Sequence, residues 1–182
     1  AGAFSSYYNA LLVKYDSTGN AQWAQTTTAA SDQTIYYSVS ASPDGMSVYA
    51  AGYLRGTSNY TWGNSVTSRG SSTHDNVVLV KYNSSGVAQW AQTVTAGSSN
   101  SYFYGVSVAS DGSVYAAGNI SGTGIYNFGN SVTAAGKSNG SNPVLVKYSS
   151  SGVAQWAQTV TAGSNDFSIL FSVSVASDGS VY

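Results

Sequence analysis

The stretch that decides the fold is Val78–Gly97, Val-Leu-Val-Lys-Tyr-Asn-Ser-Ser-Gly-Val-Ala-Gln-Trp-Ala-Gln-Thr-Val-Thr-Ala-Gly. A similar stretch occurs twice more, at Leu11–Ala30 and Val144–Gly163. The Lys-Tyr dipeptide of each copy recurs after 67 and then 66 residues, beginning at Lys14, Lys81 and Lys147. A long fixed period indicates a repeat architecture. The repeat units are residues 10–76, 77–142 and, in part, 143–182.

Each repeat contains short runs of β-favouring residues separated by turn signals, which predicts four strands joined by tight turns. A longer, Gly- and Ser-rich insertion follows the fourth run, and a short aromatic piece within it predicts a small extra hairpin. The third copy covers fewer strands. The strands predicted for the second and third copies are Val77–Tyr82, Val87–Thr95, Tyr102–Ala109, Ser113–Ile120, Val144–Tyr148, Val153–Thr161 and Ile169–Ala176.

The two faces of these predicted strands are both uncharged. In the strand at 104–109, one face carries Tyr104, Val106 and Val108, and the other carries Gly, Ser and Ala. A sheet with one solvated face would instead alternate apolar and polar residues. Large residues opposite small ones suit sheets that stack on both sides, so the sequence predicts an all-β protein of four-stranded β-propeller blades. The whole chain, 1–182, then forms one propeller segment of roughly three blades.

The composition excludes several functional classes. Charged residues make up 7% of the chain, the formal net charge is −1, and Glu and Cys are absent. This charge offers no electrostatic footprint for nucleic acid or for anionic lipid. No window of 18 apolar residues is present, which argues against membrane insertion. Without Cys there are neither disulfides nor thiolate metal sites. A composition rich in Ser, Thr, Asn and aromatic residues favours an extracellular or cell-surface location.

The motifs also resemble a known family. The segment Phe103–Gly118, which ends Gly-Val-Ser-Val-Ala-Ser-Asp-Gly-Ser-Val-Tyr-Ala-Ala-Gly, resembles the bacterial seven-bladed β-propeller repeat family, as do the Leu-Val-Lys-Tyr and Gln-Trp elements. The resemblance implies a propeller with an extracellular role. The Gly-x-x-x-Trp elements are similar to the tryptophan-docking motif of quinoprotein-type propellers, where the indole fills the gap between adjacent blades. This assigns an inter-blade structural role to Trp23, Trp90 and Trp156.

The insertions are the segments that differ most between the copies, and each carries two aromatic residues. One interpretation is that Tyr60, Trp62, Tyr126 and Phe128 cap the edge of a blade. The other is that these four residues form a surface for glycans or protein partners, because ligand-binding groups concentrate on loops.

Evidence for catalysis is weak in this sequence. His74 is the only histidine, and the equivalent positions of the other copies lack one. A Ser-His-Asp arrangement cannot be inferred from spacing alone. The repeat positions Asp44, Asp111 and Asp178 suit Asp-Gly turns, with a contact to the repeat lysines as a further expectation. We therefore expect no catalytic residues, no cofactor and no metal.

The sequence thus favours a non-enzymatic extracellular propeller with a structural or adhesive role, within a surface assembly or filament. The alternatives are a lectin-like binding module that uses the long-loop face, and a secreted hydrolase. Because a propeller usually has four to eight blades, three blades should need partners. We expect those partners to be copies of the chain or the remainder of a longer chain, with glycans as a further ligand class.

Overall fold

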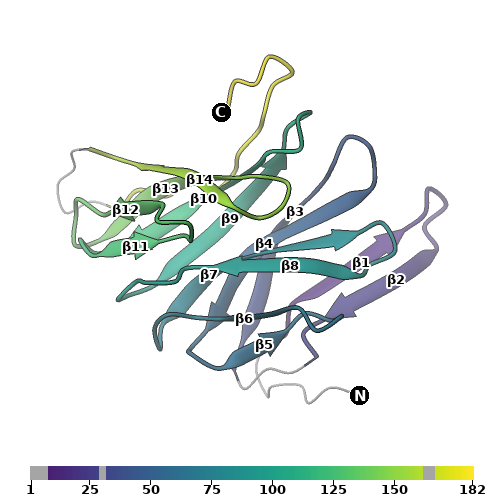
Figure 1. The fold of residues 1–182 in the computed structure, drawn as a ribbon, viewed down its shortest axis with the longest axis horizontal. Helices are drawn as coiled ribbons and strands as arrows, with labels where there is room; N and C mark the ends of the chain where they lie inside the picture. Colours follow the sequence, from purple (N-terminus) through teal and green to yellow (C-terminus); the bar gives the residue numbers. More distant parts are fainter. Residues whose placement is uncertain (1–7, 29–31, 162–166) are drawn as a thin grey trace.

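A computed structural model describes residues 8–28, 32–161 and 167–182, and every regular element within these ranges is a β-strand (Figure 1). The predicted all-β class is therefore confirmed. No helix long and apolar enough to cross a membrane occurs in the described part of the chain.

Two four-stranded antiparallel sheets form the centre of the molecule. The first sheet has the order β3-β4-β7-β8 and the second has the order β9-β10-β13-β14, so each follows the chain as an up-and-down meander. The register also repeats, because β4 pairs Tyr49 with Lys81 of β7, and β10 pairs Tyr115 with Lys147 of β13. The strands are β3 (Thr34–Ala41), β4 (Ser47–Arg55), β7 (Asp75–Asn83), β8 (Ala88–Thr93), β9 (Ser101–Val108), β10 (Val114–Ser121), β13 (Ser141–Tyr148) and β14 (Ala154–Thr159).

The first sheet is flanked by a two-stranded N-terminal hairpin, β1 (Leu11–Tyr15) and β2 (Ala21–Thr26). The second sheet is flanked by the C-terminal segment, residues 167–182, which makes a single bridge between Val175 and Val181. The strand predicted at Ile169–Ala176 is thus wrong as a regular element. The described residues hold no further strand of that unit against which its backbone could form a ladder.

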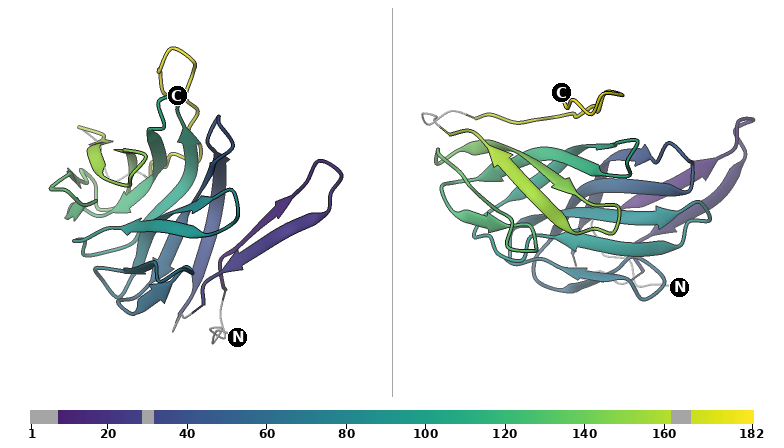
Figure 2. Two further views of the ribbon diagram at one scale, coloured as in Figure 1. Left: turned by 45° about the vertical axis from the view of Figure 1, so that its right-hand side comes forward. Right: turned by 45° about the horizontal axis from the view of Figure 1, so that its top comes forward.

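Hydrophobic packing fills the space between successive layers. One cluster joins the N-terminal hairpin to the first sheet through Leu12, Val78 and Val80. A second cluster joins the two sheets, and a third joins the second sheet to the C-terminal segment through Ala117 and Val173. Figure 2 shows the hairpin and the C-terminal segment at opposite ends of this stack. Residues on both faces of β4, β7 and β10 are therefore buried, as the uncharged strand faces predicted, whereas the edge strand β3 keeps Tyr37 and Val39 exposed.

Each insertion forms a small hairpin between the second and third strands of its sheet, as the aromatic pieces predicted. The first mini-hairpin is β5 (Asn59–Thr61) with β6 (Thr67–Arg69), and the second is β11 (Ile125–Asn127) with β12 (Thr133–Ala135). Their tips use left-handed backbone at an Asn-Ser pair in both copies.

Candidate functional site

A repeated contact links each layer to the next one. The indole Nε1 of Trp23, on the N-terminal hairpin, donates a hydrogen bond to the carbonyl oxygen of Ser84 at 3.0 Å. The same oxygen accepts from Lys14 Nζ at 3.2 Å. The indole lies so close to Gly86 that a Cβ there would be 2.7 Å from the ring. Gly86 also has a φ of +79°, so this turn needs glycine for two reasons.

The contact recurs one repeat later with the same geometry. Trp90 Nε1 and Lys81 Nζ both donate to the carbonyl oxygen of Ser150, at 3.2 and 3.1 Å. The indole lies against Gly152, whose φ is +85°. Trp156 packs edge-on against Tyr115, with ring centroids 5.8 Å apart. All three indoles are half-buried. Those of Trp23 and Trp90 lie against the glycine turn of the next layer, whereas Trp156 contacts a ring of its own sheet. We call this arrangement of Trp, Lys and glycine turn the docking contact.

The four insertion aromatics do not form a surface. Tyr60, Trp62, Tyr126 and Phe128 are all fully buried. Trp62 stacks on Tyr36 of the inner strand β3 at 5.6 Å, and its indole donates to Ser68 Oγ at 2.8 Å. The interpretation of these residues as a ligand-contacting surface is therefore wrong. Folded back over the sheets, the mini-hairpins place their rings in the cores between layers.

The repeat aspartates cap their own turns. Asp44 Oδ1 accepts from the Met46 amide at 2.9 Å, and Asp111 Oδ1 accepts from the Ser113 amide at 2.8 Å. The expected contact with the repeat lysines is not an ion pair. The described residues contain one salt bridge, which lies elsewhere. The ammonium groups of Lys14 and Lys81 donate to backbone carbonyl oxygens instead.

His74 lies on an exposed bend, where its backbone amide is bonded to Ser72 Oγ at 3.3 Å. Its imidazole makes no hydrogen bond to the described residues, so the structure brings no nucleophile and acid to it. No group of three His, Cys, Asp or Glu side chains that could hold a metal is found in the described ranges.

A row of aromatic rings runs from the edge strand β3 through the edge strand β9 to the C-terminal segment. Tyr37 of β3 lies 5.0 Å from Tyr104 of β9, and Tyr104 lies 5.4 Å from Phe171 of the C-terminal segment. These three residues occupy the same repeat position, 67 residues apart. Tyr53 and Tyr102 extend the row sideways, at 5.9 Å from Tyr37 and 5.7 Å from Tyr104 respectively. Tyr37 and Phe171 are exposed, so the row offers ring faces to solvent.

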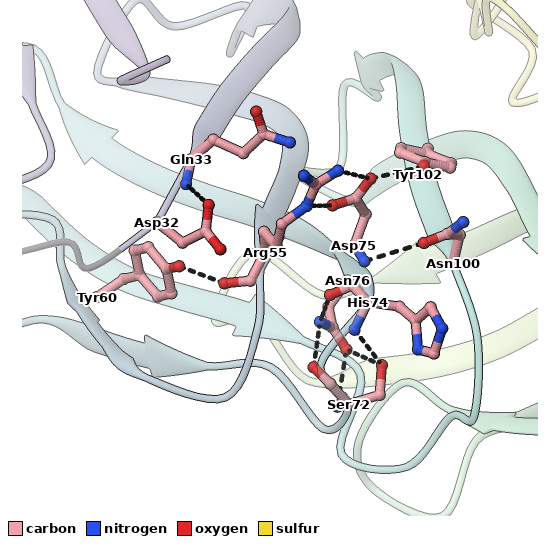
Figure 3. A network of polar contacts seen from close by, with 10 residues as sticks. All are labelled: Asp32, Gln33, Arg55, Tyr60, Ser72, His74, Asp75, Asn76, Asn100 and Tyr102. Atoms are coloured by element: carbon pink, nitrogen blue, oxygen red, sulfur yellow. Dashed lines mark hydrogen bonds and ion pairs between the residues drawn. The ribbon is translucent and has the colours of Figure 1, made fainter. Parts of the chain in front are cut away.

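A charged network anchors this aromatic row between the two sheets (Figure 3). Arg55 of β4 holds Asp75 of β7 with two hydrogen bonds, Nε to Oδ1 at 2.6 Å and Nη2 to Oδ2 at 3.1 Å. The Tyr102 hydroxyl donates to Asp75 Oδ2 at 2.7 Å, and the Asp75 amide donates to Asn100 Oδ1 at 3.1 Å. The Asp75 side chain is 6% exposed, whereas that of Arg55 is 43% exposed. The pair therefore presents its cation to solvent and buries its anion.

The tyrosines beside this network remain neutral hydrogen-bonding groups. Burial, followed by the negative charge of Asp75, raises the pKa of Tyr53 to about 12. Burial and then the hydrogen bond to Asp75 raise the pKa of Tyr102. The hydrogen bond to Asp75 raises the pKa of Arg55 further above its ordinary value. This arrangement offers aromatic faces, tyrosine hydroxyls and a guanidinium group with which a ligand could stack or form hydrogen bonds.

Sequence reasoning missed this site because it searched for features shared by all copies. Arg55 and Asp75 are replaced by Ser121 and Ser141 in the next repeat, where Asn119 Nδ2 donates to Ser141 Oγ at 3.2 Å. The sequence did contain a signal for this site. Only 7% of the chain is charged, and Arg55 and Asp75 are charged residues that the next copy lacks.

Comparison with protein-family models finds no match for this chain, and comparison with curated proteins finds none either. The antiparallel four-stranded sheets and their repeated docking contact are thus the observations from which a function can be argued.

Proposed function

We propose that this chain is a non-enzymatic β-propeller module with a structural or adhesive role outside the cell. The docking contact carries the proposal. It uses one indole, one ammonium group and one glycine turn in the same way between successive layers. A contact that repeats with each layer holds layers together, whereas a catalytic or ligand site is ordinarily built once.

The partners of this module are further blades, supplied by copies of the chain or by the remainder of a longer propeller chain. Exposed apolar side chains support this part of the proposal. Six of them lie on the N-terminal hairpin, on the edge strand β3 and on the C-terminal segment: Leu11, Tyr15, Val39, Phe167, Phe171 and Tyr182. Others are exposed on turns and strands between the two ends, at Met46, Val87, Ile125 and Val153. Large exposed apolar patches in soluble proteins commonly mark interaction surfaces.

The location and the role can be tested together on intact cells that produce the protein. Protease added outside the cells should degrade the chain while leaving a cytoplasmic marker whole. A chain that is protected in intact cells and digested only after lysis contradicts the proposal. Adhesion of the cells to an abiotic surface should fall when the chain is deleted, and an unchanged adhesion together with a normal cell surface contradicts the role.

A second candidate function is glycan binding by the aromatic row. The observation that favours it is the set of partly exposed rings beside the solvent-facing Arg55. Aromatic faces and fixed hydrogen-bond donors are the groups that pyranose rings contact. A glycan array probed with the wild type should show dose-dependent binding, which Tyr104→Ala abolishes and the matched variant Tyr104→Phe retains. Equal binding by all three proteins contradicts this function.

A further inference from the structure

In the described part of the chain, the last docking contact of the stack has donors without an acceptor. Trp156 and Lys147 stand at the repeat positions of Trp90 and Lys81, whose Nε1 and Nζ share a carbonyl oxygen. Within the described residues, Trp156 Nε1 and Lys147 Nζ donate to no protein oxygen. In the interior layers the receiving turn belongs to the next layer, and no described residue of the C-terminal segment stands at that repeat position.

The matching acceptor is at the other end of the stack. The turn of the N-terminal hairpin has the same shape as the two occupied turns, since Gly19 has a φ of +86° against +79° for Gly86 and +85° for Gly152. Nothing lies within 4 Å of a Cβ built on Gly19, whereas the other two meet an indole. The carbonyl oxygen of Ser17 stands at the repeat position of the two acceptors, and Ser17 is exposed.

A second complementary pair involves the lysine of the hairpin. Lys81 and Lys147 hold their ammonium groups over Tyr49 and Tyr115, at 5.5 and 5.4 Å from the ring centroids. The equivalent tyrosine for Lys14 would be Tyr182, at the far end of the stack. Tyr182 is 81% exposed, whereas Tyr49 is 1% exposed. Each end therefore carries one half of a cation–π contact that the interior layers complete.

One side of the N-terminal hairpin is exposed to solvent, whereas the equivalent positions of the interior layers are covered by neighbouring side chains. Leu11 of β1 is 61% exposed, whereas Val78 at the same repeat position is fully buried. A cavity of about 330 Å³ lies between the hairpin and the first sheet, lined mostly by apolar residues that include Leu12, Trp23 and Val39. The aromatic row stops at the exposed Tyr37 on this side and at the exposed Phe171 on the other.

We propose that a second copy of this chain docks head to tail, so that its C-terminal segment lies against the N-terminal hairpin of the first. The inference rests on the proposed role as a propeller module and names the partner. By the register of the interior layers, Tyr182 of one copy pairs with Lys14 of the next, and Val181 pairs with Tyr15. Trp156 and Lys147 then donate to the Ser17 carbonyl of the neighbouring copy.

One chain cannot make these contacts within itself. The N-terminal hairpin and the C-terminal segment lie at opposite ends of the stack, with both four-stranded sheets between them (Figures 1 and 2). The two halves are different surfaces, so the contact is heterologous, and repetition gives a closed ring or an open filament.

Engineered cysteines test the register directly, because the chain has no cysteine of its own. The Lys14→Cys and Tyr182→Cys variants are mixed and oxidised as whole proteins. Antiparallel partners have Cα atoms about 4.5–5.5 Å apart, which is within the range of about 4.4–6.8 Å that a disulfide bridges. We expect a product of twice the 18.7 kDa chain mass on a non-reducing gel. The matched control, Val13→Cys with Tyr182→Cys, should give no more of this product than each variant gives when oxidised alone, because adjacent strand residues point to opposite faces.

The docking contact is tested with variants on β14. Trp156→Ala should weaken self-association at least about 10-fold, as loss of an interface anchor does. The exposed neighbour Gln155→Ala should leave association unchanged. A cross-link with the control but not with Lys14→Cys overturns the register. A monomer of 18.7 kDa in light scattering, with no cross-link, overturns the docking itself. That result would leave the proposed function standing if the chain is still digested on intact cells.

Discussion

Replacing Arg55 and Asp75 by serine, singly and together, compares the stability of the ion pair with that of each charge left without its partner. The chain provides the template for this exchange, since the next repeat has Ser121 and Ser141 at the same two positions. Each serine variant therefore introduces the residue that already occupies the equivalent position of the neighbouring sheet.

The structure sets the expected magnitudes. Arg55→Ser leaves a carboxylate that is 6% exposed with no cation, and breaking a buried pair in this way costs about 3–5 kcal/mol. Because the Arg55 side chain is 43% exposed, its removal lets water approach the carboxylate, and we expect a smaller loss of about 2–3 kcal/mol. Asp75→Ser leaves a cation that solvent can hydrate, so about 1–2 kcal/mol is expected. The double variant should cost about 1 kcal/mol, because neither charge remains.

The assay is urea unfolding of all four proteins, followed by intrinsic fluorescence, at one salt concentration and pH 7. The two single losses and the double loss give the coupling energy of the pair, which should be about 2–4 kcal/mol here. A thermal scan should show Arg55→Ser melting roughly 4–12 °C below the wild type.

Additive losses would contradict this prediction, since they would mean that the two side chains do not act as a pair. An Arg55→Ser protein as stable as the wild type would also refute it, because the carboxylate of Asp75 would then be solvated without its partner. A change in the urea slope between variants would instead report a change in the surface exposed on unfolding.

Three further predictions concern the docking contact, the mini-hairpins and the tyrosines. Trp90→Ala should lower the free energy of unfolding by about 3 kcal/mol through lost packing and one hydrogen bond, whereas the exposed control Gln89→Ala should change it by less than about 0.5 kcal/mol in the same urea assay. Trp62→Phe leaves the Ser68 hydroxyl without its indole donor and should cost about 1–2 kcal/mol; adding Ser68→Ala should recover part of this loss, because the second mini-hairpin has Phe and Ala at these positions. The pKa of Tyr53 in the folded protein, about 12, lies above its value in the unfolded chain. The contribution of Tyr53 to stability is therefore complete below about pH 10 and is lost as the pH rises toward 12. Tyr53→Phe should reduce that loss of stability in unfolding curves measured between pH 9 and about 12.

Local pattern determined most of the fold. The 67- and 66-residue spacing of Val78–Gly97 and its copies predicted the two meanders, and the Asp-Gly and Ser-Gly turns predicted where the strands reverse. Strand pairing of this kind joins neighbours in the chain, so the alternation of residues and the turn chemistry are sufficient to specify it. The predicted strand at Ile169–Ala176 failed because a strand also needs partners, which no local pattern supplies.

Only the tertiary structure decided which aromatic residues are buried and which charges meet. Tyr60 and Trp62 look like loop residues in the sequence, yet the mini-hairpin folds them into a core. Arg55 and Asp75 are 20 residues apart and belong to one sheet, but the Tyr102 that completes their network comes from the next sheet. The aromatic row likewise takes one ring from each layer, Tyr37, Tyr104 and Phe171, at intervals of 67 residues. Such contacts depend on how layers stack, and stacking depends on the distance and orientation between sheets, which the period of a strand does not encode.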